Sequence, residues 1–180
     1  YEHIPVHYQD AAALNAPAFR AMNTNGTVPA IDDDGVVLFE SLAITLHLAR
    51  TRPEGGLWAA SAAGPSQILQ WTLWAATEIE PLARQWFHHT SFLPPERRRP
   101  ELAEAARAQL QTRLRVLDQQ VKEQPYLLAD GFTVADLNLA AVLQRLAVLG
   151  GENFPHAAAW HLRCLGRPAA QRAMALRQLQ

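Results

Sequence analysis

The stretch "NGTVPAIDDDGVVLFES", Asn25 to Ser41, contains two short apolar runs on either side of a polar turn. Asp34 and Gly35 form a turn pair that accepts positive φ, and the run that follows, 36–39, is rich in residues that favour strands. The stretch therefore predicts a β-hairpin. This hairpin decides how the first part of the chain folds, because it is the strongest strand signal in the sequence.

The two ends of this hairpin carry unusual residues. Its first strand begins with Pro29, which cannot donate a backbone hydrogen bond to a neighbouring strand. Its second strand ends on an acid beside a hydroxyl, Glu40 and Ser41. The stretch "SLAITLHLAR" then predicts a helix, in which Ser41 is an N-cap type of residue and Arg50 suits the negative end.

The rest of the chain divides by composition. Near the start, "HIPVHY" alternates apolar and polar residues and predicts a weak edge strand. "TRPEGGLWAASAAGP" has the composition of a linker, and almost everything after it has helical periodicity. We therefore expect a mixed strand and helix domain over 1–52, a linker over 53–64 and an all-helical domain over 65–180.

The helical part shows four main segments. Residues 66–87 have a helical apolar stripe, with Pro81 predicting a kink near Ile79. Residues 101–121 form an amphipathic helix, and the apolar run from Val134 to Gly150 predicts the central helix of the bundle. A last helix covers about 157–165, before Pro168 interrupts the pattern.

The start of the central helix has a clear capping signal. In "GFTVADL", Thr133 is an N-cap residue, and Asp136 stands three positions later, where its carboxylate can accept from the Thr133 backbone. A carboxylate used in a cap is already committed to hydrogen bonds. We therefore interpret Asp136 as structural and not as a catalytic acid.

The composition restricts the classes of function. The chain has 180 residues, 49% of them hydrophobic, and a net charge of -1 with histidine counted as neutral. Such a chain lacks the excess positive charge that nucleic acid or an anionic membrane attracts, and no apolar run reaches the roughly 18 residues of a membrane span. The histidines lack metal-ligand spacing, and a single cysteine, Cys164, precludes an internal disulfide. We expect a soluble cytoplasmic protein without metal, nucleic-acid or membrane partners.

Two stretches of the chain resemble one known family. They are "NTNGTVPAIDDDGVVLFESLAITLHLA", which begins at Asn23, and "YLLADGFTVADLNLAAVL", which begins at Tyr126. Together they resemble the cytosolic glutathione S-transferases of bacterial type, and the likeness covers essentially the whole chain in the same order. The resemblance implies a thioredoxin-like N-terminal domain, incomplete here, followed by an all-helical bundle. The fold class is then α/β plus all-α.

The resemblance also implies roles for the residues at both hairpin ends. It implies that the Val28–Pro29 peptide bond is cis, and that the backbone of Val28 binds the cysteinyl unit of glutathione. A tripeptide can pair with a free strand edge in this way. The resemblance further implies that Glu40 and Ser41 bind the γ-glutamyl group. The chemistry agrees, since a helix start and a hydroxyl favour a carboxylate, while an acid favours an ammonium.

Two departures from the family pattern affect binding and chemistry. Thr27 stands where the family often has a basic residue, which leaves the glycyl carboxylate without an assigned anchor. The Tyr, Ser or Cys that lowers the pKa of the glutathione thiol in the family falls upstream of the sequence, and we expect roughly 20 to 30 further N-terminal residues in the natural protein. Tyr1 and Tyr8 come too late for that role, and Cys164 fits a buried structural position. The catalytic residue is therefore unknown.

These observations favour a transferase that adds the glutathione thiolate to a hydrophobic electrophilic small molecule. An isomerase, peroxidase, dehalogenase or thiol-disulfide enzyme of the same fold stays open, as does a non-catalytic binding module. The electrophile pocket is expected between the domains, with Trp74 as the best candidate among the aromatic residues of 71–87. The resemblance also implies a homodimer and a role in detoxification.

Overall fold

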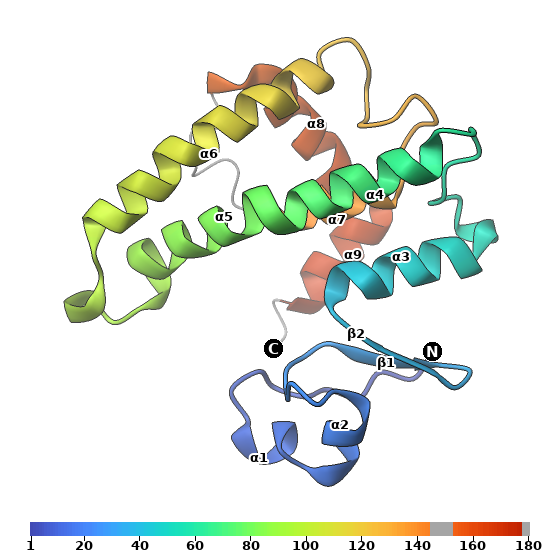
Figure 1. Cartoon of the computed structure of the whole chain (residues 1–180), viewed down its shortest axis with the longest axis vertical. Coiled ribbons are helices and arrows are strands. Elements are labelled where there is room, and N and C mark those ends of the chain that lie inside the picture. Colours follow the sequence, from blue (N-terminus) through green and yellow to red (C-terminus); the bar gives the residue numbers. More distant parts are fainter. Residues whose placement is uncertain (145–152, 178–180) are drawn as a thin grey trace. The chain divides into compact units, whose positions relative to one another are not determined.

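The computed structural model describes residues 1–144 and 153–177 of the chain. The chain divides into two compact units, Tyr1–Gly55 and Gly56–Gln180. The first contains a β-hairpin and three α-helices, and in the described part of the second the regular elements are helices joined by loops (Figure 1). This arrangement agrees with the fold class predicted from the sequence, α/β followed by all-α.

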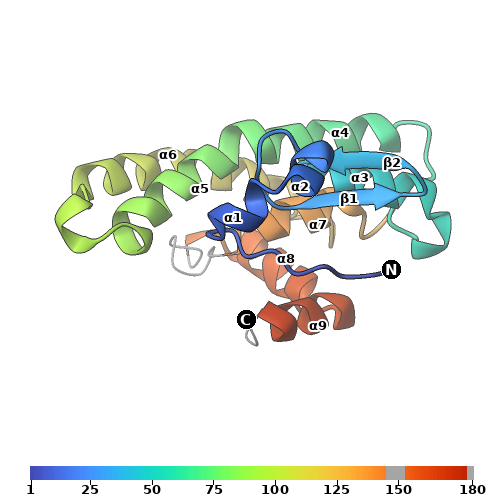
Figure 2. The same cartoon turned by 90° about the horizontal axis from the view of Figure 1, so that it is seen from below.

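The predicted hairpin is present in the first unit. Strands β1 (Ala30–Asp33) and β2 (Val36–Phe39) pair antiparallel and are joined by Asp34 and Gly35 (Figure 2). Both turn residues have positive φ, 54° and 89°, as the sequence predicts for a two-residue hairpin turn. Asp32 accepts a hydrogen bond from the Gly35 N–H at 2.8 Å, which fixes the turn further.

Three helices accompany the hairpin. The connector before it forms two short helices, α1 (Ala11–Leu14) and α2 (Pro17–Met22). The predicted helix after it is α3 (Ser41–Thr51), followed by a 3-10 turn at Pro53–Gly55. Helix α3 packs against both strands, and its buried residues are Ile44 and Ala49.

The strand predicted for "HIPVHY" is wrong. Residues 1–7 form no strand in the structure, and Ile4 is 72% exposed. Among the described residues the sheet has two strands only, β1 and β2. A period-2 pattern becomes a strand only when a partner completes its hydrogen bonds, and none of the described residues pairs with this segment.

The first long helical segment of the second unit is interrupted by π-helical turns. Helix α4 (Gly64–Trp74) leads into a π-helical turn at Ala75–Ile79, then into α5 (Glu80–Phe87) and a second π-helical turn at His88–Phe92. The first π-helical turn ends two residues before Pro81, at Ile79, where the sequence predicts a kink. Proline lacks the N–H that a regular α-helix requires there, which accounts for the interruption.

The remaining helices complete the bundle. A 3-10 turn at Pro95–Arg97 precedes the long helix α6 (Pro100–Gln120), which lies alongside α5 (Figures 1 and 2). The predicted central helix begins as α7 (Val134–Val142), and the predicted end at Gly150 and Gly151 lies outside the described residues. Helices α8 (Pro155–Leu165) and α9 (Pro168–Arg177) follow. Among the described residues, the largest fully buried side chains all lie in this unit: Trp160, Ile68, Ile79, Leu110, Leu114, Leu117, Leu127, Leu139, Leu143 and Val134.

The predicted capping box at the start of α7 is present and carries further contacts. Asp136 accepts from the Thr133 N–H at 3.0 Å, and the Thr133 hydroxyl accepts from Ala135 N–H at 3.3 Å. Asp136 also accepts from the Leu127 N–H and from the indole N–H of Trp160, both at 2.8 Å. Burial raises the pKa of Asp136, and the hydrogen bonds that it accepts oppose this shift. The carboxylate therefore joins α7, α8 and the loop before α7.

Candidate functional site

The register of the hairpin brings the four predicted binding residues to one end of it. Ala30 lies opposite Phe39 in the antiparallel ladder. The residues just outside this pair are Val28 and Pro29 before β1, and Glu40 and Ser41 after β2. Because an antiparallel pair places such flanking residues at the same end, the sequence-distant segments Val28–Pro29 and Glu40–Ser41 are neighbours here.

The backbone of Val28 is open at this end. The Val28–Pro29 peptide bond is cis, which confirms the prediction for Pro29. Val28 lies outside the paired residues of the hairpin. Within the described part of the chain, neither its N–H nor its C=O is hydrogen-bonded. Val28 therefore offers one donor and one acceptor to an extended ligand.

The loop that leads into Val28 is held by a buried amide. Asn23 is 1% exposed, and its side chain donates to the C=O of Thr27 at 2.6 Å and accepts from the Asn25 N–H at 3.0 Å. The guanidinium of Arg20 donates to the C=O of Thr24 and to the Asn15 side chain. Side chains of the same segment thus hold the loop. The backbone conformation that leads into Val28 therefore does not depend on a bound ligand.

Helix α3 begins at this end without a side-chain cap. The N-cap position is occupied by Glu40 and not, as the sequence predicts, by Ser41, which is the first helical residue. Glu40 has φ +70° and ψ 113°, a conformation that costs free energy for a residue with a side chain. Both residues are exposed, and the Ser41 hydroxyl has no hydrogen-bond partner among the described residues. The first N–H groups of α3 are therefore available to an anion.

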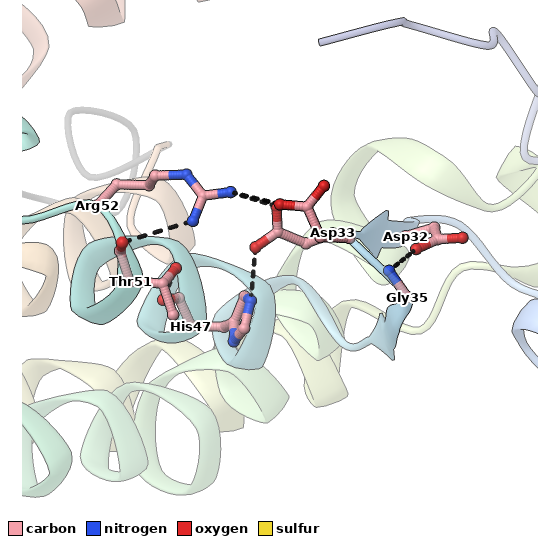
Figure 3. Close-up of polar contacts among 7 residues, drawn as sticks. Asp32, Asp33, Gly35, His47, Thr51 and Arg52 are labelled. Carbon is pink, nitrogen blue, oxygen red and sulfur yellow. Dashed lines mark hydrogen bonds and ion pairs between the residues drawn. The ribbon is translucent and has the colours of Figure 1, made fainter.

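A polar cluster at the other end of the hairpin was not found by sequence reasoning. Asp33, the last residue of β1, accepts from His47 Nε2 at 2.8 Å and from Arg52 Nη2 at 2.5 Å (Figure 3). These donors lie 14 and 19 residues further along the chain. The run of three aspartates, 32–34, was the one available signal, because an opposite charge close to an acid favours its ionised form.

The other candidate residues do not join this site. Cys164 is buried in α8, and burial raises the pKa of its thiol to about 12, so the thiolate is scarce near neutral pH. Tyr1 and Tyr8 are exposed. No group of three or more His, Cys, Asp or Glu side chains that could hold a metal is found within residues 1–144 and 153–177. In the same ranges, no helix is long and apolar enough to cross a membrane.

The aromatic residues of the second unit differ in exposure. Trp71 is 7% exposed and belongs to the core, as the sequence stripe indicates. Trp74 is half-buried and meets Trp71 edge-on, with ring centroids 5.2 Å apart. Trp74 therefore keeps part of its ring surface accessible.

Comparisons with known proteins identify the family of the chain. The family model described as "Glutathione S-transferase, N-terminal domain" matches residues 1–50, and the one described as "Glutathione S-transferase, C-terminal domain" matches residues 80–168. The chain is also 31% identical over 176 residues to glutathione S-transferase GstA of Escherichia coli O157:H7, covering 92% of this chain and 81% of that one. The chain belongs to the glutathione S-transferase family.

A solved structure and a second group of relatives extend the comparison. The theta class glutathione S-transferase from Xanthomonas axonopodis pv. citri, solved with glutathione bound, has a TM-score of 0.80 and 30% identity over 88% of this chain and 77% of that one. Human elongation factor 1-gamma is 28% identical over 170 residues. This match covers 91% of the present chain but 38% of the elongation factor, so the chain spans less than half of that relative.

Proposed function

We propose that this glutathione S-transferase family member binds glutathione at the end of the hairpin and adds its thiolate to a hydrophobic electrophilic small molecule. The observation that carries the proposal is the meeting of an unpaired Val28 backbone with the uncapped start of α3. The Val28 backbone can pair with the middle of a short peptide, and the start of α3 can bind a charged end of that peptide.

Two of the three units of glutathione, the cysteinyl and the γ-glutamyl unit, find complementary groups in this proposal. The cysteinyl unit pairs with the N–H and C=O of Val28 in the manner of an added strand. The γ-glutamyl carboxylate accepts from the Ser41 hydroxyl and from the first N–H groups of α3, and Glu40 faces the ammonium. Binding would then hold the thiol in one place, and positioning of this kind accelerates a bimolecular addition.

Calorimetric titration with glutathione tests the binding step, and a colorimetric assay with an aryl halide tests the transfer step. We expect saturable binding with one site per chain and turnover that depends on glutathione. The double variant Ser41→Ala with Glu40→Gln should lose both. Chain that is folded by circular dichroism but does not bind glutathione at millimolar concentrations would contradict the proposal.

We also propose a homodimer, because apolar side chains are exposed on regular elements of each unit. Val36, Val37 and Phe39 on β2 are 46%, 43% and 38% exposed, and Leu69 and Leu73 on α4 are 48% and 61% exposed. Leu69 and Leu73 lie four residues apart on one face of α4, and exposed apolar side chains grouped in this way are typical of protein interfaces. Light scattering should give twice the chain mass of 19.9 kDa, and Leu73→Glu should shift the mass toward one chain.

A non-catalytic glutathione S-transferase-like module is the second candidate, and the similarity to elongation factor 1-gamma favours it. In that case the chain would bind glutathione or a protein partner without turnover. Measured glutathione binding with no turnover of aryl halides, epoxides or peroxides would favour this candidate over the transferase. For both candidates we propose a cytoplasmic location, where glutathione keeps thiols reduced. We propose a role in detoxification for the transferase alone.

A further inference from the structure

Helix α3 is joined to the hairpin through one residue. Strand β2 ends at Phe39 and α3 begins at Ser41, so Glu40 alone connects them. No side chain caps the first turn of the helix. The direction in which the first N–H groups of α3 point therefore depends on contacts that the helix makes farther along its length.

The polar cluster of Asp33, His47 and Arg52 supplies such contacts. The two oxygens of the Asp33 carboxylate have different donors, since Oδ2 accepts from His47 and Oδ1 accepts from Arg52 (Figure 3). The side chains of Asp33 and His47 are 18% and 20% exposed, so their contact is largely removed from water. Contacts shielded in this way are screened less by salt than exposed ion pairs.

This cluster holds α3 at the end opposite to Ser41. His47 lies in the second half of α3, and Arg52 is its C-cap residue. With a rise of 1.5 Å per residue, α3 is roughly 16 Å long, so a displacement of about 3 Å at its far end tilts it by about 10°. A tilt of this size is at the limit that a binding site tolerates.

We propose that Asp33 is a positioning residue for the γ-glutamyl group, acting through His47 and Arg52 on the direction of α3. The inference rests on the proposed glutathione binding at Val28, Glu40 and Ser41. In the proposed binding mode, Asp33 contacts no ligand atom. It determines how the first N–H groups of α3 face the ligand carboxylate.

The neighbouring aspartate provides a matched control. Asp34 carries the same charge in the same turn, but its side chain is 97% exposed and lies 3.9 Å from Arg52. Asp34→Asn therefore removes one negative charge from the hairpin and leaves both contacts of Asp33 in place. Asp33→Asn makes the same change of charge and weakens both contacts.

The experiment uses three proteins: wild type, Asp33→Asn and Asp34→Asn. Each is titrated calorimetrically with two ligands, at a temperature where circular dichroism shows it to be folded. One ligand is glutathione, and the other is the analogue with 4-aminobutyryl in place of γ-glutamyl, which lacks only the α-carboxylate. Asp33→Asn should weaken glutathione binding about tenfold and binding of the analogue less than twofold. Asp34→Asn should change neither by more than twofold.

The pattern of losses distinguishes positioning by Asp33 from a general contribution to the fold. Equal weakening of both ligands by Asp33→Asn would show a general structural role and overturn the inference, and so would an unchanged affinity for glutathione. Wild-type chain that binds neither ligand, or binds both equally, would contradict the proposed site itself. Should Asp33→Asn fail to fold, His47→Leu removes one contact only and should show the same selective loss, smaller in size.

Discussion

Two helices of this chain begin in opposite ways. At the start of α7, the side chains of Thr133 and Asp136 are buried, and they accept hydrogen bonds from backbone and side-chain donors around them. At the start of α3, Glu40 and Ser41 are exposed, no side chain caps the helix, and Glu40 has positive φ. The first helix start is closed, and the second is open.

The difference shows how one chain separates stability from binding. Every helix begins with N–H groups that have no partner within the helix. In α7 these groups have partners outside the helix, because the Val134 N–H donates to the Leu57 C=O and the Ala135 N–H donates to the Thr133 hydroxyl. The buried Asp136 carboxylate accepts from the N–H groups just before the helix, which stabilises the fold but leaves no donor for a ligand. In α3 the first N–H groups face solvent, which costs stability and keeps them available. Substitutions at the two helix starts should therefore have different consequences.

The largest effect is expected at the closed start. Asp136→Ala leaves the Leu127 N–H and the Trp160 indole N–H buried without their acceptor, so the free energy of unfolding should fall by about 3 to 5 kcal/mol. Urea unfolding followed by tryptophan fluorescence measures this loss. The control is Asp130→Asn, which changes an exposed carboxylate bonded to Ser61. A loss no larger than that of the control would mean that α7 does not depend on its cap.

The next effect is expected at the open start and concerns binding. Ser41→Ala removes a hydroxyl that has no partner among the described residues, so the free energy of unfolding should change by less than about 0.5 kcal/mol. Glutathione affinity should fall about tenfold, because one hydrogen bond to a charged group is lost. Titration calorimetry measures the affinity, and Ser91→Ala, at an exposed serine of the second unit, is the control. An unchanged affinity would remove Ser41 from the proposed site.

Substitution of Glu40 by glycine should change the stability of the chain and its affinity for glutathione in opposite directions. Glu40→Gly replaces a residue at φ +70° by the one residue that adopts positive φ without strain, so the free energy of unfolding should rise by about 1 kcal/mol. Glutathione affinity should fall, since the carboxylate that faces the ammonium is gone. Glu40→Ala is the matched variant, because it should show the same loss of affinity without the gain in stability.

The smallest effect is a pH dependence near α7. His161 is buried in α8, with its Nε2 3.2 Å from the Ala140 C=O, and burial lowers its pKa below the ordinary 6.5. The unfolded chain then binds a proton at His161 more readily than the folded chain, so stability is unaffected well above pH 6.5 and falls as the pH drops below it. His161→Gln should reduce this fall.

Urea midpoints at pH 7.5 and 5.5, for wild type and His161→Gln, test this pH dependence. His88 changes in the same direction, because burial, Arg84 and His89 lower its pKa. The comparison of His161→Gln with wild type removes that shared contribution. Equal falls in both proteins would show that His161 does not contribute.

Features set by adjacent residues were predictable from the sequence. Asp34 and Gly35 formed the expected turn, and Thr133 with Asp136 formed the expected cap, because each depends on chemistry within four residues. The helical stripe of α6 was also predictable, since period 3.6 fixes which residues share a face. The proposed site combines two such local signals, Val28–Pro29 just before β1 and Glu40–Ser41 just after β2.

Features that depend on distant partners were not predictable. The segment "HIPVHY" has a strand pattern, yet a strand also needs a neighbour that a local pattern does not reveal. The Asp33 contacts with His47 and Arg52 depend on where α3 packs against the hairpin. The contact between Asp136 and Trp160 likewise joins residues 24 positions apart. In each case the decisive partner is chosen by tertiary packing.

The buried thiol of Cys164 can be used to detect local unfolding of the protein. The chain has one cysteine, it is 3% exposed, and its pKa is raised to about 12, so alkylating reagents should scarcely modify the native protein. The rate of any slow modification in native buffer would then report how often Cys164 in α8 becomes transiently exposed. A cysteine introduced on the surface could be tagged alone, without first replacing the natural one.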